Sequence, residues 1–191
     1  GQLLEELEKK EAAQQAYEAI LELKKKTARK YWLYAKIKQQ IFQAKENGIK
    51  PEETLLSLLK KYDNRPFEHV IYRALGTFYL EKNQDSLAES YFAASQKAST
   101  LDEPTQKANY RDLADFYFLR GAYGKTGAYV DSLIPLLKQK SLTQKRTQRE
   151  RDNLQGILEY ENQIQSTDSL MHLMGLTKEA QTEFFTNYLE E

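Results

Sequence analysis

The chain has 191 residues, 40% of them hydrophobic, and its 28 Lys and Arg balance its 28 Asp and Glu. This length allows one domain or one repeat array with a buried core, and the balanced charge argues against a general nucleic-acid or membrane-surface binder. The absence of Cys excludes disulfides and thiolate metal sites, and no apolar run approaches the roughly 20 residues of a membrane span. Few Gly and Pro beside abundant Ala, Leu, Gln, Glu and Lys indicate a mostly helical protein.

The first predicted helix covers residues 7–26, "LEKKEAAQQAYEAILELKKK". We expect it to be the second helix of a repeat whose first half lies outside this sequence. The next predicted hairpin covers residues 34–62. Its second helix starts at Pro51 and continues with Glu52 and Glu53, which are favoured at helix N-termini.

A clearer hairpin is predicted within residues 72–95. Two runs of large and small residues have helical spacing and are separated by the polar stretch 82–85, with Asp85 as the expected N-cap of the second helix. We expect Gly76 and Ala88 to lie where the two helices approach closely. The runs are Tyr72, Leu75, Gly76 and Tyr79, and then Ala88, Tyr91, Phe92 and Ser95.

The same pattern recurs every 38 residues. The third copy is a hairpin over residues 110–134 with Gly121 and Tyr123 in its turn, and Pro135 is expected to end its second helix near Ile134. Only the first copy departs from the pattern, because Lys38 stands where the other copies have a small residue. The matching sets are Tyr34, Tyr72 and Tyr110; Ile37, Leu75 and Leu113; Ile41, Tyr79 and Tyr117; and on the last helix Thr126, Val130 and Leu133.

The C-terminal part predicts two further helices. A long helix begins at Ser141, which with Gln144 forms a possible capping box, and it should cap the last hairpin. We expect a break at "STDS", residues 166–169, and a last helix capped by Thr177. The expected organisation is hairpins over 1–140 and capping helices over 141–191, with about eight or nine helices in all. We expect the sequence to be a piece of a longer protein.

The hairpin pattern resembles the tetratricopeptide repeat, most closely over residues 72–95. This resemblance implies an all-α, right-handed tetratricopeptide-type helical solenoid with a long C-terminal capping helix. It assigns Tyr72, Leu75, Gly76, Tyr79 and Phe92 to the packing core. The repeat length of 38 residues, against the usual 34, implies longer connections such as residues 99–106.

Two further stretches, "PFEHVIYRALG" at 66–76 and "TDSLMHLMGL" at 167–176, resemble the SprE/PorW lipoproteins of the Bacteroidetes type IX secretion and gliding machinery. In this resemblance Asp168, Ser169 and Leu170 match a helix-break motif. The resemblance covers roughly residues 28–188. It implies an outer-membrane-anchored scaffold facing the periplasm, with its signal peptide and lipid-bearing Cys upstream. The implied partners are other proteins of the secretion machinery.

In a tetratricopeptide solenoid the first helices line a concave groove, which makes their exposed positions candidates for binding a partner. A mixed apolar and charged row of this kind suits a peptide or helix of mixed character. The candidates are Arg73, Thr77, Leu80 and Glu81 in one repeat, and Arg111, Asp115, Phe118 and Leu119 in the next.

A second candidate surface is the basic segment 138–151, which has a single acidic residue, Glu150. Basic residues at the start of a helix oppose its dipole, which hints at another use such as docking an acidic partner, although a solvated helix face is the simpler explanation. Its candidate residues are Lys145, Arg146 and Arg149.

No nucleotide, hydrolase or metalloprotease motif occurs, and we expect no catalytic site, metal or cofactor. His69 and His172 are expected to be surface or half-buried histidines. Glu52 and Glu53 are expected to act as helix N-terminal charges. Two alternatives to a secretion-machinery scaffold stay open: a tetratricopeptide adaptor of another pathway, and an all-helical enzyme or small-molecule sensor with a pocket around Arg73 and Arg111.

Overall fold

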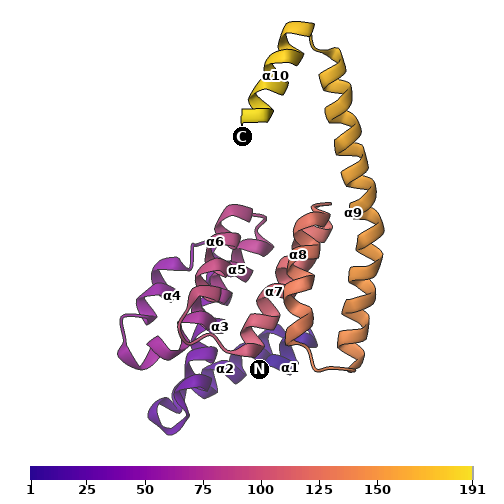
Figure 1. The fold of residues 1–191 in the computed structure, drawn as a ribbon. Helices are drawn as coiled ribbons and strands as arrows, with labels where there is room; N and C mark the ends of the chain where they lie inside the picture. Colours follow the sequence, from indigo (N-terminus) through magenta and orange to yellow (C-terminus); the bar gives the residue numbers. More distant parts are fainter. Residues whose placement is uncertain (191) are drawn as a thin grey trace. The chain divides into compact units, whose positions relative to one another are not determined.

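The computed structural model describes residues 1–190, and its regular elements are all helical (Figure 1). This confirms the all-α class. Within the described residues there are ten α-helices and three short 3-10 helices, slightly more than expected, and no strand. The elements are α1 (Gln2–Glu6), α2 (Lys10–Glu22), η1 (Lys24–Lys26), α3 (Arg29–Asn47), α4 (Glu52–Leu58), η2 (Tyr62–Phe67), α5 (Glu68–Glu81), α6 (Asp85–Lys97), α7 (Glu103–Leu119), α8 (Tyr123–Leu133), η3 (Ile134–Leu136), α9 (Leu142–Gly175) and α10 (Lys178–Glu190).

The chain forms two compact units, Gly1–Asp112 and Leu113–Glu191, whose boundary lies inside α7. Residues within each of these units contact one another more than they contact residues of the other unit. The boundary expected from the sequence at residues 140 and 141 separates hairpins from capping helices, and it stays a prediction.

In the first unit, α5 and α6 form the predicted helical hairpin. Leu75, Ala88 and Phe92 are fully buried between them. A Cβ atom placed on Gly76 would lie 3.0 Å from Cδ2 of the Phe92 ring, which is tighter than nearly all Cβ contacts in proteins. The predicted close approach of the two helices at Gly76 is therefore confirmed.

Aromatic packing repeats with the 38-residue period. Tyr79 stacks on Tyr91 with ring centroids 5.8 Å apart and planes 11° apart. In the second unit, Tyr117 stacks on Tyr129 at 5.6 Å and 7°. Each stacked pair joins the first helix of a hairpin to its second helix. The sequence register thus corresponds to a repeated three-dimensional arrangement within each hairpin.

The turns repeat as well. Asn83 and Gly121 both adopt left-handed backbone conformations, with φ of 55° and 70°. The amide that follows each of them donates a 3.0 Å hydrogen bond to the carbonyl of the stacked tyrosine, Tyr79 or Tyr117. Such a left-handed residue ends a helix and satisfies its free carbonyls. Because Asn83 provides the turn, Gln84 occupies the N-cap position and Asp85 already belongs to α6, so the expected N-cap was wrong by one residue.

The N-terminal segment forms a third hairpin of this kind. Residues 7–26 are not one helix: α1 ends at a turn in which Glu8 has φ of 56° and the amide of Lys9 bonds the carbonyl of Leu4 at 2.8 Å. A side chain on Gly1 would overlap the Tyr17 ring, just as one on Gly76 would press on Phe92. As expected, α2 is the second helix of a hairpin, but its first helix, α1, lies within the sequence and not outside it.

The hairpin of α3 and α4 is the divergent copy. Leu33 and Ile37 are buried like their counterparts one period later, but α3 continues to Asn47 and ends with left-handed Gly48. The predicted second helix, 51–62, is only α4, because the 3-10 helix η2, which contains Pro66, follows it. The single tryptophan, Trp32, lies in α3 with the guanidinium carbon of Arg29 4.2 Å from its ring centroid.

In the second unit, α8 ends at Leu133 and Pro135 lies in η3, as predicted. The first half of α9 packs on α8 through buried Thr147 and Leu154. Ser141 caps α9, because its hydroxyl accepts a 3.1 Å hydrogen bond from the amide of Gln144. The side chain of Gln144 in turn accepts a 2.7 Å bond from the amide of Lys140, whereas in a standard capping box it would accept from the amide of Ser141.

The expected break at residues 166–169 was wrong, because α9 continues without interruption to Gly175. The hydroxyl of Thr167 donates a 2.8 Å hydrogen bond to the carbonyl of Gln163, one turn earlier in the helix. This polar side chain is therefore hydrogen-bonded without interrupting the helix. The segment Asp168–Leu170 is therefore not a helix break here. The chain turns at Leu176, and Thr177 accepts a 3.4 Å bond from the amide of Ala180 at the start of α10, as predicted.

Candidate functional site

The four predicted binding residues of the first row follow one face of α5. Arg73, Thr77 and Leu80 are half-buried and Glu81 is exposed. Glu81 forms an ion pair with Lys45 of α3, where α5 ends. This face of α5 is thus connected to the preceding hairpin through a charged contact.

A cavity of about 770 Å³ lies in the first unit beside this ion pair. The ion pair between Lys38 and Glu5, at 2.7 Å, belongs to its wall, together with Lys45 and Glu81. Between these charges it exposes a small apolar surface. The lining residues are Glu5, Lys10, Ala13, Gln14, Tyr17, Glu18, Lys38, Gln39, Phe42, Gln43, Lys45, Glu46 and Glu81.

Of the predicted residues, only Glu81 lines this cavity. The binding candidates predicted from the sequence did not include Lys38, Phe42 or Lys45, because the first hairpin is the divergent copy and its register gives no groove positions. The 38-residue register does single out Lys38, because it places this charge where Gly76 lies one period later, but that signal indicates a divergent copy rather than a binding site.

Arg73 is engaged inside the protein. Its two terminal nitrogens donate to Oδ1 of Asn109 at 2.8 Å and to Oδ2 of Asp112 at 2.7 Å, both on α7. Asn109 is fully buried and itself donates to the hydroxyl of Ser95 at 2.9 Å. Arg73 therefore joins α5 to α7, and a partner that used its guanidinium would compete with these bonds.

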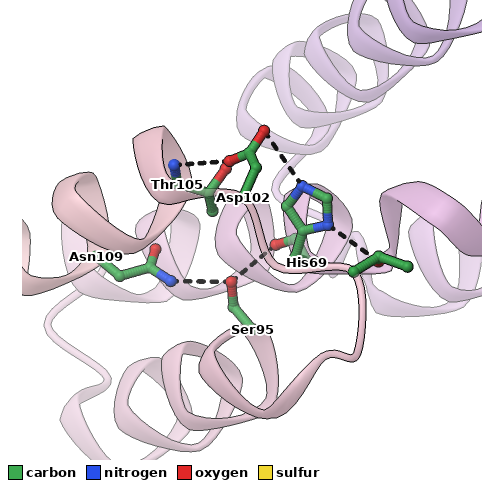
Figure 2. Close-up of polar contacts among 6 residues, drawn as sticks. His69, Ser95, Asp102, Thr105 and Asn109 are labelled. Carbon is green, nitrogen blue, oxygen red and sulfur yellow. Dashed lines mark hydrogen bonds and ion pairs between the residues drawn. The ribbon is translucent and has the colours of Figure 1, made fainter.

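His69 lies in the same polar cluster, shown in Figure 2, and it is buried with only 3% of its surface exposed. This differs from the surface or half-buried position expected, because His69 belongs to the first turn of α5 and the segment before α7 covers it. Its ring nitrogens face the hydroxyl of Thr100 at 3.3 Å and Asp102 at 3.7 Å. His172, in contrast, is exposed.

Burial lowers the pKa of His69, because the charged imidazolium is poorly solvated, although Asp102 opposes this effect. Burial alone would raise the pKa of Asp102, but the hydrogen bonds from Thr105 outweigh it and lower the pKa, with His69 contributing in the same direction. Asp102 accepts the amide of Thr105 at 2.8 Å (Figure 2) and so satisfies a free amide at the start of α7.

Ser95, His69 and Asp102 have the residue types of a catalytic triad but not its geometry. The Ser95 hydroxyl donates to the backbone carbonyl of His69 at 2.8 Å rather than to its ring, as Figure 2 shows. Ser95 is also fully buried, so no substrate reaches it. The cluster ties α5, α6 and α7 together.

Among the residues that the structure describes, no group of three or more acidic or histidine side chains is arranged to hold a metal ion. In the same part of the chain, no helix combines the length and apolar character that crossing a bilayer requires.

The second predicted row lies on α7 and crosses the boundary between the two units. Arg111 is half-buried in the first unit, whereas Asp115, Phe118 and Leu119 are exposed in the second. Phe118 is 46% exposed and contacts Tyr123 edge to face, and Leu119 is 81% exposed. Because this row spans both units, a groove made of it and the row on α5 stays a prediction.

The residues of the basic segment occupy the first half of α9, where Lys145, Arg146 and Arg149 are all exposed. Arg151, in contrast, faces α8 and donates to Asp131 at 2.6 Å. The three candidate residues thus face solvent, whereas Arg151 makes a structural contact.

No protein-family model matches this sequence, and no curated protein matches it either.

Proposed function

We propose that this chain is a protein-interaction scaffold built as a right-handed solenoid of tetratricopeptide-like hairpins. The observation that carries the proposal is the repeated hairpin geometry: the stacked pairs Tyr79–Tyr91 and Tyr117–Tyr129, with left-handed turns in register 38 residues apart. Hairpins that repeat in this way stack on their neighbours and leave one face of the first helices for ligands.

The cavity bounded by Glu5, Lys38, Phe42 and Glu81 is the binding site we favour for a partner segment. Its ion pairs place both charge signs in its wall, and Phe42 is the half-buried apolar side chain among its lining residues, since Tyr17 and Ala13 are buried. A peptide or helix with an apolar anchor between charged residues of both signs fits this chemistry. The predicted residues Thr77 and Leu80 do not line the cavity but lie within about one turn of Glu81 on α5.

We further propose that the partners belong to a cell-envelope assembly of the type IX secretion or gliding class, at the periplasmic face of the outer membrane. This proposal is supported only by the resemblance of residues 66–76 and 167–176 to SprE/PorW lipoproteins, and the continuous helix at Asp168–Leu170 departs from that pattern. Fractionation of the natural full-length protein tests it. Recovery in the outer-membrane fraction with a lipid-modified Cys is expected, and recovery in the cytosol would exclude this role.

An adaptor of another pathway fits the same fold. A sensor or enzyme built around Arg73 gains less support, because the Arg73 guanidinium is bonded to Asn109 and Asp112.

Site-specific photocrosslinking tests the scaffold proposal. A benzoylphenylalanine replaces Phe42 or Glu81 at the cavity, or Phe118 on α7, and crosslinked proteins are identified after irradiation of the natural host's envelope extract. We expect one protein to be captured at Phe42 and Glu81 and not at Tyr62, a control site that is 79% exposed in η2. Equal capture at Tyr62 would show that the cavity is not a specific site.

The row on α7 is tested separately with the double variant Arg111→Ala, Phe118→Ala. If this row contributes, crosslinking of that protein at Phe42 weakens while the melting temperature stays unchanged. Undiminished crosslinking would remove the α7 row from the binding surface and leave the cavity.

A further inference from the structure

The second half of α9 exposes a continuous line of large apolar side chains. Ile157, Tyr160, Ile164, Met171 and Met174 are each between 38% and 79% exposed. They follow one another at intervals of three, four and seven residues, which is the seam spacing of a coiled coil, with Thr167 completing the pattern. Exposed apolar surface of this extent marks an interaction site rather than ordinary solvent-facing helix.

This seam lies on the side of α9 that faces away from α8. Leu158 and Arg151 lie against Gly127 of α8, and Arg151 also bonds Asp131, while Thr147 and Leu154 are buried on the same side of α9. At 3.6 residues per turn, Tyr160 and Ile164 lie roughly 150° and 110° around the helix from the mean direction of these residues. Packing of α9 within its own unit therefore leaves the seam uncovered.

The three exposed basic residues lie on the same side of the helix. Arg146 and Arg149 precede Ile157 by three and two turns, and Lys145 borders them. We call this continuous surface, the basic trio Lys145, Arg146 and Arg149 followed by the apolar seam, the outer stripe of α9. Its two parts are chemically distinct.

The charges beside the seam are acidic. Residues 152–177 include Asp152, Glu159, Glu161 and Asp168 but no Lys or Arg. Glu161 and Asp168 directly border the seam on one side. The outer stripe thus has a basic end and an apolar part with an acidic border.

A second copy of the chain fits this pattern poorly. A parallel pair would place Lys145, Arg146 and Arg149 against the same residues of the other copy, and like charges at that distance repel. An antiparallel pair with both seams in register would bring Glu161 next to Asp168 of the other copy. The charge pattern therefore favours a different protein.

We propose that the outer stripe binds an amphipathic helix of another protein. The apolar side chains of about three heptads of that helix pack against residues 157–174. Its acidic side chains lie against Lys145, Arg146 and Arg149. Since eight residues separate Arg149 from Ile157, the acidic cluster of the partner lies about 12 Å from its apolar seam. This surface is separate from the cavity at Phe42, and either site can fail without the other.

Two synthetic helices of about 28 residues serve as probes. Each has three heptads with Leu at the seam positions and a fourth heptad with Glu on the same face, placed at the N-terminus in one peptide and at the C-terminus in the other. Fluorescence anisotropy measures their binding to the whole chain at low and high salt. We expect one of the two to bind, and replacing its Glu by Lys to weaken binding about tenfold or more at low salt.

Variants assign the binding to the two parts of the stripe. Ile164→Asp with Met171→Asp should abolish binding, whereas Arg146→Glu with Arg149→Glu should weaken it about tenfold and remove its salt dependence. The matched control is Ser169→Asp with His172→Asp, two exposed positions on the other side of α9, which should leave binding unchanged. Circular dichroism verifies that all variants keep the helix content of the parent.

Three outcomes would overturn the proposal. One is that neither peptide binds, or that a peptide binds the variant Ile164→Asp, Met171→Asp as tightly as it binds the parent. Another is that sedimentation shows a dimer of the parent that this variant dissociates, which would identify a second copy as the occupant. The last is that the chain binds vesicles containing phosphatidylserine through the seam but neither peptide, which would indicate a membrane surface.

Discussion

At Gly76 the ring of Phe92 fills the space that a side chain would need. Gly76→Leu should lower the free energy of unfolding by about 1–3 kcal/mol, because the two helices must separate or Phe92 must leave its rotamer. Urea unfolding measures the change. Gly156→Ala on α9 is the control: nothing lies near its Cβ position, so helix propensity alone should stabilise by up to about 1 kcal/mol. A Gly76→Leu protein as stable as the parent would contradict the close contact.

The buried imidazole of His69 makes stability depend on pH. Its pKa is lowered from 6.5 in the folded state, so the unfolded chain takes up the proton first as the pH falls. The contribution of His69 to stability is therefore complete above pH 6.5 and is lost as the pH drops below 6.5 towards the folded-state pKa.

Urea unfolding of the parent at pH values from 8 to 5 should show this loss, and His69→Gln should flatten the dependence near pH 6. The exposed His172 provides the control, since His172→Gln should leave the slope as it is. If His172→Gln flattened the curve and His69→Gln did not, the assignment to His69 would be wrong.

Turns between the paired helices depend on a left-handed residue at the same place in each repeat. At Gly121, with φ of 70° and open space around it, the cost of a side chain is conformational only. Gly121→Ala should cost about 1–2 kcal/mol, and Gly121→Asn clearly less, because Asn tolerates this conformation as it does at position 83. Thermal melting ranks the two variants; an alanine variant at least as stable as the asparagine one would argue against the left-handed turn.

These elements were predictable to different degrees. The hairpin α5–α6 and the end of α8 followed from helical spacing and from Pro135, since both are local signals. The continuity of α9 through residues 166–169 did not, because Ser, Thr and Asp suggest a turn unless their side chains bond back to the helix, as Thr167 does.

Across each unit, stability should follow burial. In the second half of α9, the side chains of residues 159, 160 and 170–172 are exposed. In α5, by contrast, Ile71 and Leu75 are fully buried. Hydrogen exchange should therefore be slower in α5 than in this part of α9 by about two orders of magnitude or more. Mass spectrometry of peptic fragments measures both regions in one sample. Comparable protection would mean that the outer stripe is already covered, for example by self-association.

The candidate sites were less predictable than the fold. The sequence register assigned candidate residues to α5 and α7, of which only Glu81, Asp115, Phe118 and Leu119 are exposed. It could not show that Arg73 is bonded to Asn109 and Asp112, because those contacts join residues 36 and 39 positions apart. The cavity beside Phe42 also combines four helices, and only the packed structure brings their side chains together. Pairing over such distances leaves no local sequence signal.

The stack of Arg29 on Trp32 has a practical consequence for the whole chain. Because Trp32 is the only tryptophan and lies in the first unit, its emission reports the unfolding of that unit alone. Far-ultraviolet circular dichroism, in contrast, is summed over the helices of both units. One titration followed by both signals thus reveals whether the two units lose their structure in a single cooperative step or one after the other.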